Sequence, residues 1–216
     1  KFYNIYCIMK ILYIRRKNFT QFLLNNYLDA KKTDIIIFAP DCIPFINIDN
    51  ELEGLSNDLT SLCYLSKTIG VTIIVFCKVL LSKELDKVTN AGLVISEGKL
   101  LGICEEIDIY DTSKVTSINV YEIDNHRICV LVGNNSKVAE FIHGIDNSSV
   151  TNTNLARYFL QEFNLASIIA SKNKVEVFGK KKQVENKKNA SVIYLNKLGS
   201  KRMPTYFKYL HKSIYS

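Results

Sequence analysis

The sequence predicts a layered α/β protein built around a mixed β-sheet. Two observations carry this prediction. Short apolar runs rich in β-branched residues indicate strands, and in the first part of the chain they alternate with segments whose apolar residues recur at helical spacing. The chain has 216 residues, of which 47% are hydrophobic, so it can bury one substantial core and is expected to form a single domain over residues 1–216.

The predicted strands begin with the N-terminal segment FYNIYCIMKILYI. Its apolar residues could indicate a signal peptide, but Lys10 interrupts the run and no small-residue cleavage site follows, so we expect a buried strand. No apolar run reaches the roughly 18–20 residues that a membrane span needs. Further strands are predicted at Ile35–Phe38, Val71–Phe76, Gly92–Ile95, Ile118–Ile123 and Ile128–Val132.

Three segments show helical periodicity: Asn18–Lys31, Asp58–Thr68 and Thr153–Phe163. The second is expected to end at Gly70, because glycine tolerates the backbone conformation that caps a helix. A threonine or asparagine is available to cap the start of the third helix. The polar segment Asp146–Asn154 is expected to form a loop.

Six cysteines, at positions 7, 42, 63, 77, 104 and 129, are scattered singly inside hydrophobic runs. No CxxC pair occurs, and the spacing indicates neither a disulfide framework nor a zinc site, so buried free thiols in a reducing cytoplasm are expected. His126 is expected in a turn, His143 in a loop and His211 in the basic tail. No two of them have metal-ligand spacing, so no metal is expected.

Positive charge is concentrated near the C-terminus. Residues 172–216 contain twelve lysines and arginines and two glutamates, a net charge of +10, whereas the whole chain carries +7. A basic segment can attract nucleic acid or an acidic membrane surface. However, the segment contains no recognised nucleic-acid-binding module, so we prefer a solvated face or a lysine-rich composition.

Two segments carry the clearest motifs: NAGLVISEGKLLG at Asn90–Gly102 and HRICVLVGNN at His126–Asn135. They resemble two core strands of the carbon–nitrogen hydrolase (nitrilase) superfamily. The segments TDIIIFAPD, LTSLCYLSKTIGVTIIVFC and VIYLNKLGS match the order of that family's motifs, so the resemblance covers most of residues 11–200. Ser171 and Gly179-Lys180 also show a weaker similarity to the glutaminase domain of NAD synthetases.

The resemblance implies an α-β-β-α sandwich, in which two mixed sheets lie face to face with helices outside. It also implies a homodimer, and an apolar outer face on Thr153–Phe163 would mark that interface. For chemistry it implies a cysteine nucleophile, a glutamate that takes the thiol proton and a lysine that stabilises the intermediate, all at strand ends. It implies no cofactor.

The three chemical positions of the family hold other residue types in this chain. The glutamate position falls on Pro40, the lysine position on Glu106 and the cysteine position on Gly133. A glutamate at the lysine position would repel a developing oxyanion, and glycine has no side chain to act as a nucleophile. Asp41 is a weak candidate for the base, because a one-residue shift would bring it to the glutamate position.

Displaced thiols could in principle retain the chemistry. Cys129 lies four residues before Gly133, on the same strand face but roughly 13 Å away, so it is expected in the core. Cys42 and Cys104 are predicted near the pocket rim, without a base at a defined position. The sequence therefore predicts a domain that has lost hydrolysis and serves as a binding, structural or regulatory protein of unidentified ligand. The alternatives are an active amidase or nitrilase with a displaced cysteine, and nucleic-acid binding through the basic segment.

Overall fold

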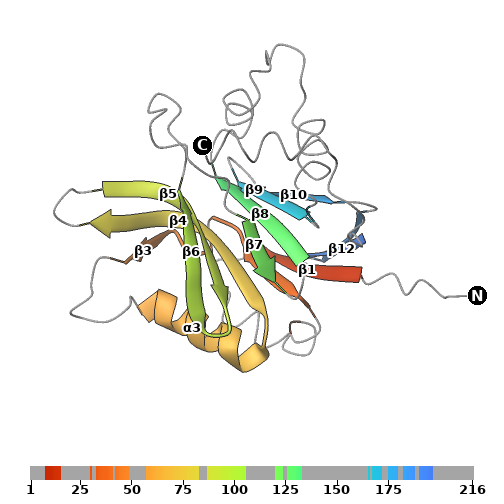
Figure 1. The fold of residues 1–216 in the computed structure, drawn as a ribbon, viewed down its shortest axis with the longest axis horizontal. Coiled ribbons are helices and arrows are strands. Elements are labelled where there is room, and N and C mark those ends of the chain that lie inside the picture. The colour runs from red at the N-terminus through yellow and green to blue at the C-terminus, as the bar shows by residue number, and fades with distance from the viewer. Residues whose placement is uncertain are drawn as a thin grey trace, which may run out of the picture.

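The computed structural model describes residues 8–15, 30, 33–40, 42–48, 57–82, 87–105, 120–123, 126–132, 165, 167–171, 175–179, 182–187 and 190–196. Within these residues the chain forms two β-sheets and the helix α3 (Asn57–Ile69) (Figure 1). The strands are β1 (Ile8–Ile14), β2 (Ile35–Phe38), β3 (Phe45–Asn47), β4 (Thr72–Ser82), β5 (Lys87–Ser96), β6 (Lys99–Glu105), β7 (Val120–Ile123), β8 (His126–Val132), β9 (Ser167–Ser171), β10 (Val175–Gly179), β11 (Gln183–Lys187) and β12 (Ala190–Asn196).

The larger sheet has eight strands in the order β11-β12-β1-β2-β4-β5-β6, with β3 paired to β4 off this path. Strands β1, β2, β3 and β4 run parallel, whereas the pairs β4–β5, β5–β6, β1–β12 and β11–β12 are antiparallel. The smaller sheet has the order β10-β9-β8-β7, and β8 and β9 are parallel. Both sheets are therefore mixed, as the sequence predicts.

The strand predictions are confirmed at β1, β2, β4, β5, β7 and β8, although β4 and β5 are longer than predicted. One local prediction is wrong: His126 is the first residue of β8, paired with Ile123, and does not lie in a turn. The helix predicted at Asn18–Lys31 lies outside the described residues apart from Ala30, which is helical. The helix predicted at Thr153–Phe163 lies wholly outside them.

Helix α3 confirms the helix predicted at Asp58–Thr68, and it ends where the sequence indicates. Gly70 follows it with a φ of 73°. The Gly70 N–H donates to the Ser66 carbonyl (2.9 Å), and so does the Val71 N–H (3.2 Å). These bonds satisfy a carbonyl that would otherwise lack a partner at the helix end, and they turn the chain into β4. Within the described part of the chain, no helix has the length and apolarity needed to cross a membrane.

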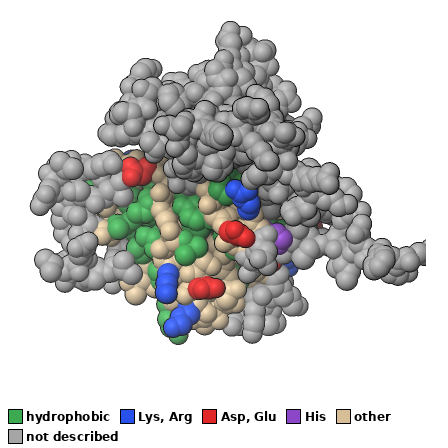
Figure 2. All heavy atoms as spheres, viewed as in Figure 1, with side chains coloured by type: hydrophobic (Ala, Val, Ile, Leu, Met, Phe, Trp, Pro, Cys, Tyr) green, Lys and Arg blue, Asp and Glu red, His purple; other side chains and the backbone are tan. Residues whose placement is uncertain are grey.

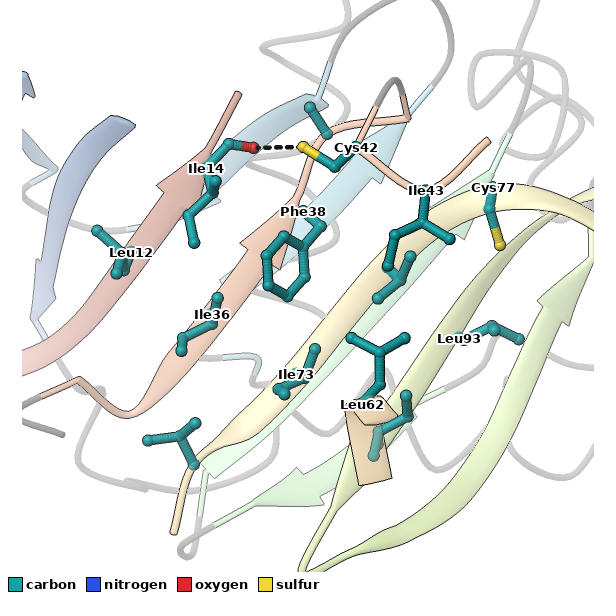
Figure 3. Packing of buried hydrophobic residues seen from close by; sticks show 14 of the residues in the cluster. Leu12, Ile14, Ile36, Phe38, Cys42, Ile43, Leu62, Ile73, Cys77 and Leu93 are labelled. Carbon is teal, nitrogen blue, oxygen red and sulfur yellow. Dashed lines mark hydrogen bonds between the residues drawn. The ribbon is translucent and has the colours of Figure 1, made fainter. Parts of the chain in front are cut away.

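One apolar core lies between α3 and the larger sheet. Figure 3 shows how Leu62 of the helix packs over side chains from neighbouring strands, among them Ile36, Phe38 and Ile73. All four residues of β2 are buried, because alternate side chains face opposite sides of a sheet that is covered on both. Burying an isoleucine or phenylalanine side chain contributes about 1.5–3 kcal/mol to the free energy of folding.

A second core lies between the two sheets. It combines alternate residues of the larger sheet, such as Ile37 and Phe76, with Ile128, Val130 and Val132 of β8. The sheets therefore pack face to face, with α3 on the outer side of the larger one (Figure 1). We call the side of the larger sheet that carries this second core its inner face.

The glycines of the NAGLVISEGKLLG segment have distinct packing reasons. Glu97 (φ 52°) and Gly98 (φ 79°) form the two-residue connection between β5 and β6, a conformation that glycine favours. Gly102 leaves room for Tyr121 of β7, whose hydroxyl would overlap any Cβ placed there. That hydroxyl forms a hydrogen bond with the Cys104 thiol (3.2 Å), which joins the two sheets.

Candidate functional site

Strand β2 ends in a turn that contains Pro40. The Ala39 N–H donates to the Ile14 carbonyl (2.9 Å), and the Cys42 N–H donates to the Ala39 carbonyl (2.9 Å). These bonds fix the backbone on both sides of Pro40, which is half-buried. A proline ring cannot accept a proton, so this strand end has no general base at Pro40. Asp41 lies outside the described residues.

The strand register places the end of β6 at the same end of the larger sheet. The row of Cα partners that passes through Phe38 crosses β4 and β5 and reaches Ile103. Pro40 follows the end of β2 by two residues and Glu105 is the last residue of β6, so both lie at this end of the larger sheet. The sequence continues from Glu105 to Glu106, which lies outside the described residues.

Strand β8 runs toward this same end, as two contacts between the sheets show. A Cβ on Gly92 would lie 3.1 Å from the Val130 side chain, and Gly92 is in the row just beyond that of Phe38. At the opposite end, Gly179 packs against Leu195, and Gly179 is linked through β9 to the start of β8. The strand ends that precede Glu106 and Gly133 therefore lie at one end of the sandwich, together with Pro40. Gly133 lies outside the described residues.

The described thiols are all free and buried, as expected: Cys42, Cys63, Cys77, Cys104 and Cys129. Burial raises the pKa of Cys129, and the nearby Cys104 raises it further. Burial also raises the pKa of Cys63, and it raises that of Cys77 to about 12. Among the described residues, no group of three histidine, cysteine or acidic side chains could hold a metal ion.

The sequence predicts Cys42 and Cys104 near the rim of the pocket, and the structure shows that both side chains are buried. Cys42 belongs to the core on the α3 side, and its thiol donates to the Ile14 carbonyl (3.5 Å; Figure 3). Cys104 is 1% exposed and lies between the sheets, bonded to Tyr121. Both side chains are therefore buried in a core, and their position relative to a pocket rim stays a prediction.

Sequence reasoning missed a lysine at the same end of the larger sheet. Strand β4 continues past Phe76, which lies in the core between the sheets, whereas Cys77 packs on the α3 side. By alternation, Lys78 is on the inner face, paired with Phe45 of β3 and Asn90 of β5, and it is exposed. The predicted strand ends at Phe76, whereas β4 continues to Ser82 and so includes Lys78.

The two-sheet arrangement has the same fold as solved structures of the carbon–nitrogen hydrolase (nitrilase) superfamily, which confirms the predicted fold class. Solved structures with this fold include Saccharomyces cerevisiae Nit3, a member of branch 10 of the nitrilase superfamily, with a TM-score of 0.60 and 10% identity over 95% of this chain and 94% of that one. A carbon–nitrogen hydrolase from Helicobacter pylori G27 is similar with a TM-score of 0.51 and 11% identity over 88% of this chain and 89% of that one.

A third similar structure is a cysteine-to-alanine mutant of an amidase from Nesterenkonia sp. AN1 in complex with butyramide. It has a TM-score of 0.53 and 11% identity over 95% of this chain and 96% of that one. No protein-family model matches the sequence, and a search of curated proteins finds no match either. Structural similarity at such low sequence identity shows a common fold and does not show a common activity.

Proposed function

We propose that this chain is a carbon–nitrogen hydrolase-fold domain that does not hydrolyse C–N bonds and acts as a binding or regulatory protein. The observation that carries this proposal is Pro40 at the end of β2, where the turn is held by backbone hydrogen bonds. The sequence places Glu106 and Gly133 directly after the two neighbouring strand ends. None of the three residues can supply the group that amide hydrolysis needs at its position.

The chemistry of the described thiols supports the same proposal. The thiolate, not the thiol, attacks a carbonyl carbon. With a pKa of about 12, Cys77 would be ionised in roughly one molecule in 10⁵ at pH 7. Its side chain also belongs to the α3-side core, away from the inner face. Cys129 is buried and its pKa is raised as well, so neither thiol has the exposure or the acidity of a nucleophile.

The alternative is an active amidase or nitrilase with a displaced cysteine. Among the described thiols, Cys104 is the candidate nucleophile to test because of its position. It lies between the sheets, one row from the end where Pro40 lies. Its burial and its bond to Tyr121 argue against attack on a substrate.

Ammonia release from a panel of amides that includes butyramide and glutamine tests the proposal. The wild type is compared with Cys104→Ala and with a control that was unfolded, treated with iodoacetamide to block its thiols, and then refolded. We expect no release above the level of the blocked protein. Turnover that disappears when one cysteine is replaced would establish the displaced-cysteine enzyme in place of the proposed function.

We also propose that the protein is a homodimer that works in a reducing cytoplasm. The dimer is supported by the resemblance to the family, and the compartment by the buried free thiols. Light scattering coupled to gel filtration tests the dimer, which should have twice the chain mass of 24.7 kDa. A mass equal to that of one chain at micromolar concentration would exclude it.

Nucleic-acid binding is the less favoured candidate function. On the face shown in Figure 2, the described surface has hydrophobic side chains at its centre, with basic and acidic side chains both present around them. A binding surface for phosphates would instead concentrate basic residues. If the basic segment binds nucleic acid, affinity will fall steeply with salt and drop when Lys180–Lys182 are neutralised.

A further inference from the structure

The inner face of the larger sheet continues beyond the residues that pack against β8. Register aligns Phe45, Lys78 and Asn90 in one row across β3, β4 and β5. The next row across the same three strands contains Asn47, Leu80 and Val88. Because residues aligned across neighbouring strands share a face, these six side chains form one surface, which we call the β3–β5 surface.

The composition of the β3–β5 surface combines apolar contact area with one positive charge. Phe45 is 45% exposed and Val88 is 51% exposed. Lys78 and Asn90 are exposed as well, and Leu80 is partly buried. None of the six residues is acidic. Within the described part of the chain, the Lys78 ammonium group forms no hydrogen bond or ion pair.

The β3–β5 surface adjoins the end of the sandwich where Pro40 lies. Lys78 is two residues past Phe76, which packs next to Gly92 and Val130 in the core between the sheets. A molecule seated on this surface would therefore contact the end of the inter-sheet core. An exposed cation at such a place is solvated when nothing is bound, so it gains most from a ligand that brings the opposite charge.

We propose that the β3–β5 surface binds a short-chain carboxylic acid. The carboxylate pairs with the Lys78 ammonium group, and the alkyl chain lies against Phe45 and Val88. This inference rests on the proposed function, because a protein that retains an acid without making it has no need of a nucleophile. The inference adds a class of ligand, short-chain carboxylic acids, and a binding residue, Lys78, that is not one of the three positions equivalent to the family's catalytic residues.

The charge on Lys78 predicts a preference for an acid over its amide. Butyrate and butyramide have the same number of heavy atoms, and they differ in charge at the end that would meet Lys78. An exposed ion pair contributes at most about 1 kcal/mol, so the preference should be about fivefold, with weak overall affinity. Salt should reduce it, because an exposed charge pair is screened.

The experiment is a titration of the ¹⁵N-labelled full chain with butyrate and, separately, butyramide, followed by amide chemical shifts. We expect butyrate to shift amides of β3, β4 and β5 and to bind about fivefold more tightly than butyramide. The Lys78→Gln variant should lose this preference. The Lys78→Arg variant, which retains the charge, should keep it. Lys99→Gln removes another exposed positive charge, at the other end of the β5–β6 hairpin, and should behave as the wild type.

Two results would overturn the inference: no shift of β3–β5 amides by butyrate, or a butyrate preference that persists in Lys78→Gln. Spectra of each variant without ligand show whether it is folded. If Lys78→Gln is not folded, the salt dependence of the wild type replaces it, and a butyrate preference that salt does not reduce overturns the inference. The proposed function fails separately. Release of ammonia from butyramide during the titration would contradict it, whether or not Lys78 determines the binding of butyrate.

Discussion

Replacing Gly102 by alanine should destabilise the protein by about 2 kcal/mol through its contact with Tyr121. The new methyl group would overlap the Tyr121 hydroxyl, so the ring must move. Overpacking of this kind costs about 1–3 kcal/mol, and loss of the hydrogen bond to Cys104 costs about 0.5–1.5 kcal/mol more. Alanine recovers about 0.5–1 kcal/mol, because it loses less conformational entropy than glycine on folding.

Urea unfolding measures this effect, and a double-mutant cycle identifies its cause. With a slope of about 2 kcal/mol per molar urea, the midpoint of Gly102→Ala should fall by about 1 M. Tyr121→Phe alone should cost about 1 kcal/mol, since it removes only the hydroxyl. In the double variant the overlapping atom is gone, so the loss should be smaller than the sum of the single losses by about 1 kcal/mol. Additive losses, or a Gly102→Ala midpoint equal to that of the wild type, would refute this account of how β7 is held.

Two other features give further predictions. Gly98→Ala should lower the free energy of unfolding by about 1–2 kcal/mol in the same urea assay, because φ is 79° and the new Cβ would lie 3.0 Å from the Lys67 Cβ. Glu97→Asn should instead raise it by about 0.5 kcal/mol, because asparagine followed by glycine is favoured in a two-residue hairpin turn. Equal midpoints for both variants would contradict the turn assignment. Burial raises the pKa of Cys77 to about 12, so the folded state keeps a proton that the unfolded state loses from about pH 9 upward, and stability falls as pH rises through that window. The stability difference between the wild type and Cys77→Ala should therefore narrow between pH 8 and pH 10, and a constant difference would contradict the raised pKa.

Much of the fold could be predicted because the strands of the larger sheet are buried on both faces. Ile35–Phe38 reads as an uninterrupted apolar run for that reason, and its limits match β2. The limits of β4 and β5 were harder to predict. Lys78 and Asn90 are polar and exposed, so they interrupt the apolar pattern while the hydrogen-bonded ladder continues past them.

The candidate site was less predictable from the sequence than the fold. Pro40 could be assigned from its motif, and the register then places the end of β2 at the same end of the larger sheet as the end of β6. Local sequence spacing does not show into which core the Cys42 and Cys104 side chains point. That depends on the geometry of the turn after β2 and on which face of the larger sheet the smaller sheet covers. Lys78 gave no signal, because a single lysine within an apolar run is common on the solvent-exposed part of a strand.

The loss of the nucleophile is the central claim, and reaction with fluoroacetamide tests it most directly. In the amidase from Nesterenkonia sp. AN1, a mutant structure shows the acetamide moiety of fluoroacetamide covalently added at the active-site cysteine. The folded chain described here should show no adduct by intact mass at neutral pH after an incubation that labels the unfolded chain. A single acetamide adduct that forms faster on the folded chain than on the unfolded one would contradict the claim.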